Sequence, residues 1–119
     1  MRVRAARGAI QVPADDIDAI LSRTRRLLAE MLSRNGVDTE DLISVLFTVT
    51  EDLHAAFPAE AARRMGLGLV PLMCAREIPV PGAMDRVVRV LMHFHSGLDL
   101  AEVVHVYLDG AESLRDDLG

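Results

Sequence analysis

The sequence contains no lysine, so all 13 of its basic residues are arginine. A guanidinium is planar and permanently charged, and it recognises carboxylate or phosphate groups through paired hydrogen bonds. Arg89 stands in the middle of the apolar run 87–94, and the predicted N-terminal strand repeats the pattern with Arg2, Arg4 and Arg7. A buried guanidinium stays charged and needs several hydrogen-bond partners. Arg89 therefore indicates either a pocket for a small anionic ligand or an internal pair with a carboxylate.

Cysteine and aromatic residues are also scarce. The single cysteine, Cys74, excludes an intrachain disulfide and a zinc site of the multi-cysteine type. Aromatic residues make up 3% of the chain, the net charge is −5 and the arginines are spread along the sequence, which argues against nucleic-acid binding. No apolar run approaches the roughly 20 residues of a membrane span, and the N-terminal segment is too charged and too short for a signal peptide. We therefore expect a cytoplasmic protein that binds neither nucleic acid nor membrane.

Aliphatic residues are abundant instead. Hydrophobic residues make up 50% of the chain, and the mean hydropathy is +0.22. A length of 119 residues fits a single domain that spans residues 1–119. Because subunit association hides excess apolar surface, this composition predicts a homo-oligomer.

Hydrophobic periodicity predicts the elements. A long helix is expected from a cap at Asp15 or Asp16 to about Arg34, with Asn35-Gly36 as its C-terminal stop. A shorter helix is expected over 58–66. Strands are predicted at 2–12, 42–50, 69–75, 85–95 and 103–108, followed by a short C-terminal turn or helix. This order predicts an α+β (mixed α/β) fold, with one five-stranded mixed sheet covered by the long helix.

Common catalytic motifs are missing from the sequence. It has no P-loop, no GxGxxG and no serine in a nucleophile-elbow context. His93 and His95 would point to one face of a strand, where His105 could join them as metal ligands. No HExxH or carboxylate spacing supports a metal there, so we predict surface or interface histidines and no metal or cofactor. For His54 we predict a structural role in its turn.

Four further residues have ordinary interpretations when each is considered alone. Cys74 is then a small buried hydrophobe, and Glu77 is a solvated carboxylate. Tyr107 is a packed ring whose hydroxyl reaches a strand edge. Arg115 is a surface charge. Only the order of these residues along the chain indicates more.

Six segments occur in an order and spacing that is typical of one family. They are residues 4–9, 50–59, 70–77, 86–90, 105–108 and 114–118. The most specific are DLHAAFPA at 52–59 and HVYL at 105–108. Together they resemble the small monofunctional bacterial chorismate mutases of the trimeric pseudo-α/β-barrel type. The resemblance covers essentially the whole chain.

The resemblance implies an assembly and a reaction. The assembly would be a homotrimer with active sites in clefts between neighbouring subunits. The enzyme would be an isomerase that rearranges chorismate to prephenate in phenylalanine and tyrosine biosynthesis. This one-substrate pericyclic step needs no nucleophile, metal or proton transfer, so the lack of a catalytic triad is expected.

The resemblance also implies roles for individual residues. Arg7 would bind a substrate carboxylate with Tyr107 nearby. Arg89 would contact a carboxylate and the ether oxygen of the breaking bond, and Glu77 and the Cys74 region would hold the ring hydroxyl. The other implied site residues are the apolar wall Phe57, Ala59 and Met73, the lid residues Leu114 and Arg115, and Arg63 at the mouth.

Two positions depart from the family pattern. Glu60 stands where a lysine can occur, so a cationic role there is lost. Met73 replaces a small polar residue, which puts a side-chain hydrogen bond at that position in doubt.

Two other functions fit part of the sequence. A non-catalytic trimer could bind a small carboxylate with its arginines, and a structural oligomer could pair its buried arginines with Glu51 or Glu77. We favour catalysis because the arginines at positions 7 and 89 occur together with Glu77 and Tyr107. A sensor would need the anion contacts but not a contact for the ring hydroxyl.

Overall fold

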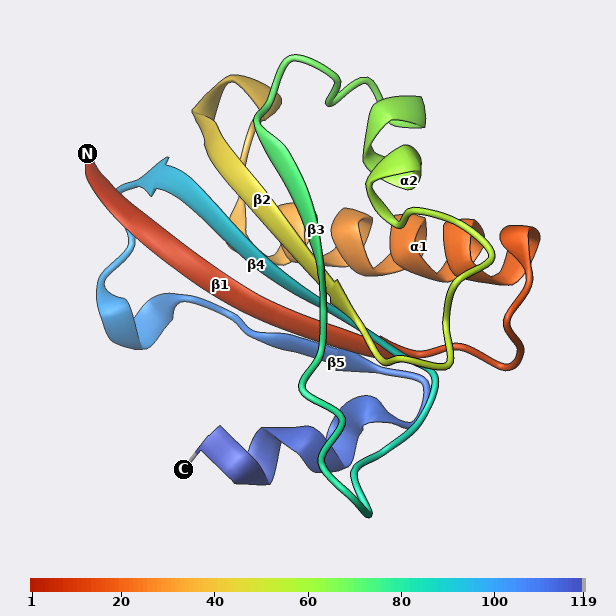
Figure 1. Ribbon diagram of the computed structural model, residues 1–119. Helices are drawn as coiled ribbons and strands as arrows, with labels where there is room; N and C mark the ends of the chain where they lie inside the picture. The colour runs from red at the N-terminus through yellow and green to blue at the C-terminus, as the bar shows by residue number, and fades with distance from the viewer. Residues whose placement is uncertain (119) are drawn as a thin grey trace.

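One β-sheet and one long helix dominate the molecule (Figure 1). The computed structural model describes residues 1–118. The sheet has the order β3-β2-β4-β1-β5, and its strands are β1 (Arg2–Gln11), β2 (Leu42–Val49), β3 (Leu72–Arg76), β4 (Val87–Ser96) and β5 (Val106–Leu108). The helices are α1 (Ile17–Asn35), α2 (Ala59–Arg64) and the short 3-10 helices η1 (Thr39–Asp41), η2 (Leu100–Glu102) and η3 (Ala111–Leu118). The predicted α+β fold with a five-stranded sheet is confirmed.

The strand pairing makes the sheet mixed. β4 runs antiparallel to both β1 and β2, whereas β3 is parallel to β2 and β5 is parallel to β1. The register opposes Arg89 to Ala9 on one side and to Thr48 on the other. Arg89 therefore lies on the central strand of the sheet, with neighbouring strands on both sides.

Both ends of α1 are fixed by its own sequence. The side chain of Asp16 accepts a hydrogen bond from the Ala19 backbone N–H at 2.8 Å, so Asp16 is the N-cap. At the other end Gly36 adopts φ 61°, and its N–H donates to the Ser33 carbonyl. Such a left-handed terminal residue favours glycine. None of the helices within residues 1–118 combines the length and the apolar character needed to cross a membrane.

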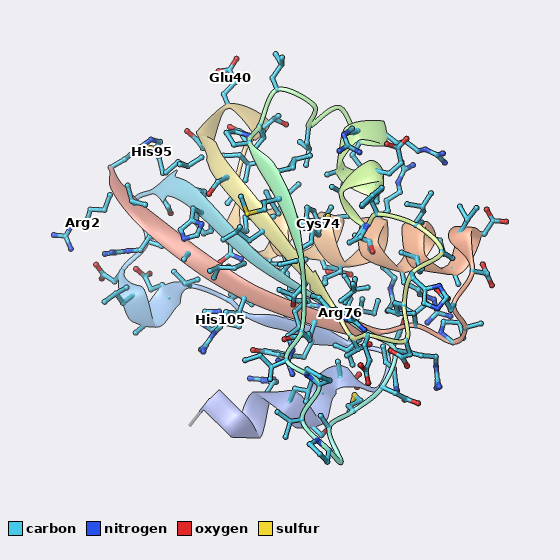
Figure 2. All side chains as sticks on the ribbon, viewed as in Figure 1. Arg2, Glu40, Cys74, Arg76, His95 and His105 are labelled. Carbon is cyan, nitrogen blue, oxygen red and sulfur yellow. The ribbon has the colours of Figure 1, made fainter. Side chains whose placement is uncertain are left out.

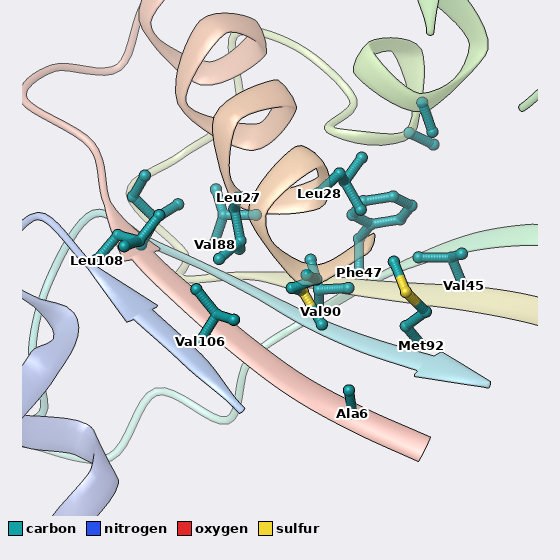
Figure 3. Close-up of a cluster of buried hydrophobic side chains, with 14 of the residues drawn as sticks. Ala6, Leu27, Leu28, Val45, Phe47, Val88, Val90, Met92, Val106 and Leu108 are labelled. Atoms are coloured by element: carbon teal, nitrogen blue, oxygen red, sulfur yellow. The ribbon is translucent and has the colours of Figure 1, made fainter. Parts of the chain in front are cut away.

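α1 packs on one face of the sheet and forms the main core there (Figure 3). Val88, Val90 and Met92 of β4 are buried on this face, together with Leu27 and Leu28 of α1. Successive strand residues point to opposite faces of a sheet. The alternation in β4 therefore directs Arg89 to the face opposite α1, which we call the open face.

Part of the open face is covered by η3. A second, smaller core forms there from Ala9 and Val87 together with Tyr107, Ala111 and Leu114. Near the other edge of the sheet this face is not covered, and Met73 of β3 is 62% exposed there. The open face is therefore closed beside β5 and accessible beside β3.

All five strands differ from their predicted bounds, by one or two residues in β1, β2 and β4 and by three residues at the starts of β3 and β5. The third strand begins at Leu72 rather than at residue 69, because the chain first turns with a hydrogen bond from Val70 N–H to the Leu67 carbonyl. The fifth strand begins at Val106 rather than at residue 103. There the Asn35 side chain bonds both the N–H and the carbonyl of Val104, so these backbone groups do not join the sheet.

Gly8 allows the close approach of β1 to α1. A Cβ atom at this position would lie 2.5 Å from the Met31 sulfur and 3.2 Å from Leu27 Cδ1. We expect Gly8→Ala to lower the free energy of unfolding by about 1–3 kcal/mol, because overpacking forces neighbouring side chains to shift. Urea unfolding at a fixed protein concentration measures this loss. Gly97→Ala is the control, since its Cβ would meet no atom within 4 Å; equal losses in both variants would contradict the packing argument.

Candidate active site

Arg89 and Glu77 form an ion pair on the open face. Arg89 Nε lies 2.6 Å from Glu77 Oε1, and the two side chains are 41% and 26% exposed. The Thr48 hydroxyl donates a hydrogen bond of 3.0 Å to the same carboxylate oxygen. Glu77 directly follows β3, Thr48 lies on β2 and Arg89 lies on β4, so the pair spans three adjacent strands.

A cavity of about 370 Å³ lies beside this ion pair. Its lining includes Arg7 from β1 and Tyr107 from β5 as well as Thr48, Glu77 and Arg89. The two interpretations of Arg89 from the sequence are therefore both present, because the guanidinium has a carboxylate partner and also borders an open cavity. Four of the predicted site residues meet here within one chain.

His105 connects the two strands that carry Arg7 and Tyr107. Its Nδ1 accepts a hydrogen bond from the Arg7 backbone N–H at 3.0 Å, just before the β1–β5 ladder begins at Gly8 and Val106. Burial, and then the positive charges of Arg7 and Arg115, hold the pKa of His105 below its usual value. The imidazole is therefore neutral near pH 7, as an acceptor at Nδ1 must be.

The other histidines are separated from His105. His93 Nδ1 lies 3.1 Å from the Ser44 hydroxyl, and His95 is exposed near the N-terminal end of β1 (Figure 2). Within residues 1–118 no group of three or more histidine, cysteine or acidic side chains could hold a metal ion. His105 was considered as a metal ligand and as part of the HVYL segment, and its bond to the backbone of Arg7 was not predicted.

The predicted lid residues lie on η3, which follows the cavity residue Tyr107 of β5. In η3, Leu114 is 9% exposed and packs in the cluster that contains Tyr107, whereas the Arg115 side chain is exposed. Asp109 anchors the start of this segment, because its carboxylate lies 2.7 Å from both Arg23 and Arg26 of α1. The hydrogen bond from Arg26 is the main reason why the pKa of Asp109 is lowered.

A second group of predicted residues lies on the other side of β3. Cys74 packs against the core beneath α1 and α2, since it alternates with Met73 and Ala75 along the strand. Together with Phe57 it lines a cavity of about 610 Å³, and Ala75 borders both cavities. Phe57 is 73% exposed. Within one chain, Cys74 and Glu77 therefore face different cavities.

The remaining predicted residues lie on α2. Ala59 is 2% exposed and belongs to the main core. Glu60 holds two arginines, with Oε1 at 3.0 Å from Arg63 and Oε2 at 3.3 Å from Arg64. The hydrogen bond from Arg63 is the main reason why the pKa of Glu60 is lowered. The residue that departs from the family pattern thus partly neutralises the arginine predicted at the mouth.

Asp15 fixes the loop that carries Phe57. Its Oδ1 accepts hydrogen bonds of 2.9 Å from the backbone N–H groups of His54 and Ala55, and its Oδ2 lies 3.1 Å from His54 Nδ1. The backbone bond from His54 is the main cause that lowers the pKa of Asp15. The contact between the His54 ring and Asp15 is consistent with the structural role predicted for His54 in this turn.

Comparison with known proteins identifies the family. The family model "Chorismate mutase type I" matches residues 3–118. The chain is 53% identical over 117 residues to Chorismate mutase AroH of Thermus thermophilus, which covers 98% of this chain and 96% of that protein. It is 37% identical over 119 residues to Chorismate mutase AroH of Bacillus subtilis (strain 168), which covers 99% of this chain and 94% of that protein.

A solved structure agrees with these sequence matches. The structure titled "Chorismate mutase from Clostridium thermocellum Cth-682" superposes with a TM-score of 0.91 at 47% identity, covering 92% of this chain and 98% of that one. The chain therefore belongs to the chorismate mutase type I family, whose rearrangement of chorismate to prephenate in aromatic amino acid biosynthesis is the reaction predicted from the sequence. The predicted family, enzyme class and fold are confirmed.

Proposed function

We propose that chorismate binds in the cavity beside the Arg89–Glu77 pair and rearranges there to prephenate. One observation carries this proposal: Arg89 Nε lies 2.6 Å from Glu77 Oε1, at the edge of a cavity of about 370 Å³ that Arg7 and Tyr107 also line. Glu77 lies close to Nε of Arg89, and in this proposal the Nη groups of the guanidinium donate to the substrate. Arg7 binds a substrate carboxylate near Tyr107, and Glu77 accepts a hydrogen bond from the ring hydroxyl.

The reaction requires the protein to select one substrate conformer and to stabilise developing charge. The ether C–O bond breaks while a C–C bond forms in the same molecule, so no proton or electron has to be exchanged with a side chain. The cavity holds the compact conformer in which the two carbons meet. Arg89 donates to a substrate carboxylate and to the ether oxygen, where negative charge develops as the C–O bond stretches. Glu77 fixes the direction of that guanidinium.

We further propose that each complete site lies between two subunits of a homotrimer. One subunit supplies the arginine side, consisting of Arg7, Glu77, Arg89 and Tyr107. Its neighbour supplies the wall side, consisting of Phe57, Met73 and Cys74 with Arg63 at the mouth and Ala59 behind it. The two cavities within one chain support this division for Phe57 and Cys74, which line the cavity away from Arg89. Met73 lines neither cavity, and its exposure on the open face leaves it accessible to a neighbouring subunit. Leu114 and Arg115 close the arginine side as a lid.

A direct ultraviolet assay tests the proposed function. Chorismate should disappear in the presence of the purified protein with no added cofactor, and light scattering should give three times the chain mass. A protein that binds chorismate without consuming it would be a carboxylate-binding protein, which would refute the catalytic proposal.

The lid residue Arg115 should contribute to substrate capture. Because Arg115 is exposed on η3 and would meet the dianion only when the lid closes, Arg115→Ala should raise KM about tenfold, the effect of one lost charge-assisted hydrogen bond. The turnover number kcat should stay within about twofold, as steady-state kinetics can show. Its exposed neighbour Ser113 provides the control Ser113→Ala. A large loss of kcat at unchanged KM would contradict the lid role.

A further inference from the structure

Thr48 occupies the position between Glu77 and Arg89. β2 lies between β3 and β4 in the sheet, and Thr48 is the register partner of Arg89. Its hydroxyl donates to Glu77 Oε1 at 3.0 Å, the oxygen that also lies 2.6 Å from Arg89 Nε. One carboxylate oxygen therefore faces two donors from two neighbouring strands.

The hydrogen bond from Thr48 restrains the side-chain carboxylate of Glu77, whereas another bond restrains its backbone. The Glu77 backbone N–H donates to the Val49 carbonyl at 2.8 Å, which holds the main chain to β2. Glu77 itself lies beyond the last residue of β3, so strand pairing does not continue past it to hold its side chain in place. Threonine is β-branched and restricted at χ1, so its hydroxyl direction is well defined.

We propose that Thr48 is a positioning residue for the rearrangement. Its hydroxyl fixes the Glu77 carboxylate, and through Glu77 it fixes the direction of the Arg89 guanidinium toward the substrate. Thr48 acts through Glu77 and makes no contact with the reacting atoms. This inference rests on the proposed function of the cavity and adds a residue that the sequence patterns do not single out.

Kinetics of the isosteric variant Thr48→Val test the role. Because the carboxylate loses a charge-assisted hydrogen bond and its fixed direction, kcat for chorismate should fall about tenfold, with a smaller change in KM. Thr48→Ser keeps the hydroxyl and should restore kcat to within about twofold of the unmodified protein. A Thr48→Val variant whose kcat lies within twofold of the unmodified protein would overturn the proposal.

Thr24 offers a matched control for the same substitution. It is buried on α1, and within residues 1–118 it is the site of a buried hydroxyl without a hydrogen-bond partner. Thr24→Val removes a hydroxyl from the core without touching the cavity, so kcat should be unchanged. An equal loss of kcat in Thr24→Val and Thr48→Val would mean that general packing, rather than Glu77, is responsible.

A double-mutant cycle separates positioning from a merely structural role. In a Glu77→Ala background, Thr48→Val should change kcat less than twofold, because the group that Thr48 orients is already gone. A further tenfold loss in that background would overturn the proposal. A crystal structure of Thr48→Val provides a readout that does not depend on residual activity, since it should show an intact sheet and a displaced Glu77 carboxylate. An undisplaced carboxylate would also refute the role.

The failure of this inference can be told from failure of the proposed function. If the unmodified protein does not consume chorismate, the proposed function itself is wrong. If it does and Thr48→Val matches it, only the role of Thr48 is wrong.

Discussion

Replacement of Arg89 by citrulline should lower kcat for chorismate by about 10²–10³-fold, the typical effect of losing one preorganised donor at a developing charge. Citrulline keeps the length and planarity of the side chain but has no positive charge. The substrate retains Arg7 and the apolar wall in its ground state, so KM should change much less than kcat. The loss belongs mainly to the transition state, where the stretching C–O bond places negative charge near this side chain.

Arg34 on the surface of α1 provides the control for this prediction. Arg34→citrulline removes a charge from the surface of α1, where Arg34 pairs with Glu30 one turn away at 2.9 Å. Such exposed pairs contribute little, so this variant should keep the kcat and KM of the unmodified enzyme. If Arg89→citrulline changed only KM, Arg89 would bind substrate without stabilising the transition state.

Most of the fold can be predicted from the sequence, because helix caps and the alternation of a strand depend on residues that are close together in the chain. The caps of α1, Asp16 and Gly36, lie next to the residues that they terminate. The alternation in residues 87–94 predicts a strand and places Arg89 within it, whatever packs on either side. Those two elements position the rest, since α1 covers one sheet face and β4 is the central strand.

The details of the site depend on contacts between distant segments. The convergence of Thr48, Glu77 and Arg89 requires the register of three strands, which no local pattern determines. The short β5 has the same kind of cause, because Asn35, far away in the sequence, takes the backbone groups of Val104. The bond from Arg7 to His105 likewise joins residues 98 positions apart.

The spacing between Cys74 and Glu77 already indicated that the two side chains point to opposite faces of the sheet. Cys74 and Glu77 are separated by three positions, and residues an odd number apart on an extended segment point to opposite faces. The resemblance implied that both hold the ring hydroxyl. In one chain they line different cavities, which is the basis for proposing that Cys74 and Glu77 of one site come from two subunits.

Mixing two inactive variants should therefore restore activity. Arg89→Ala removes the charge from the arginine side of the site. Phe57→Asp places a negative charge on the wall side against a doubly negative substrate. The side chain is 73% exposed in the single chain, so the fold of the subunit should tolerate the change. When the two variants are co-expressed in equal amounts and purified together, about one quarter of the sites should combine two intact sides, because each side is intact in half of the subunits.

The distribution of recovered activity decides whether the site is shared between subunits. Arg89→Ala and Arg7→Ala both damage the arginine side, so every mixed site of that pair keeps one defect and the mixture should show no recovery. Recovery with Phe57→Asp but not with Arg7→Ala requires the arginine side and the wall side to come from different chains. If both groups acted within one chain, the Phe57→Asp mixture would also remain inactive, since no subunit would carry both sides intact.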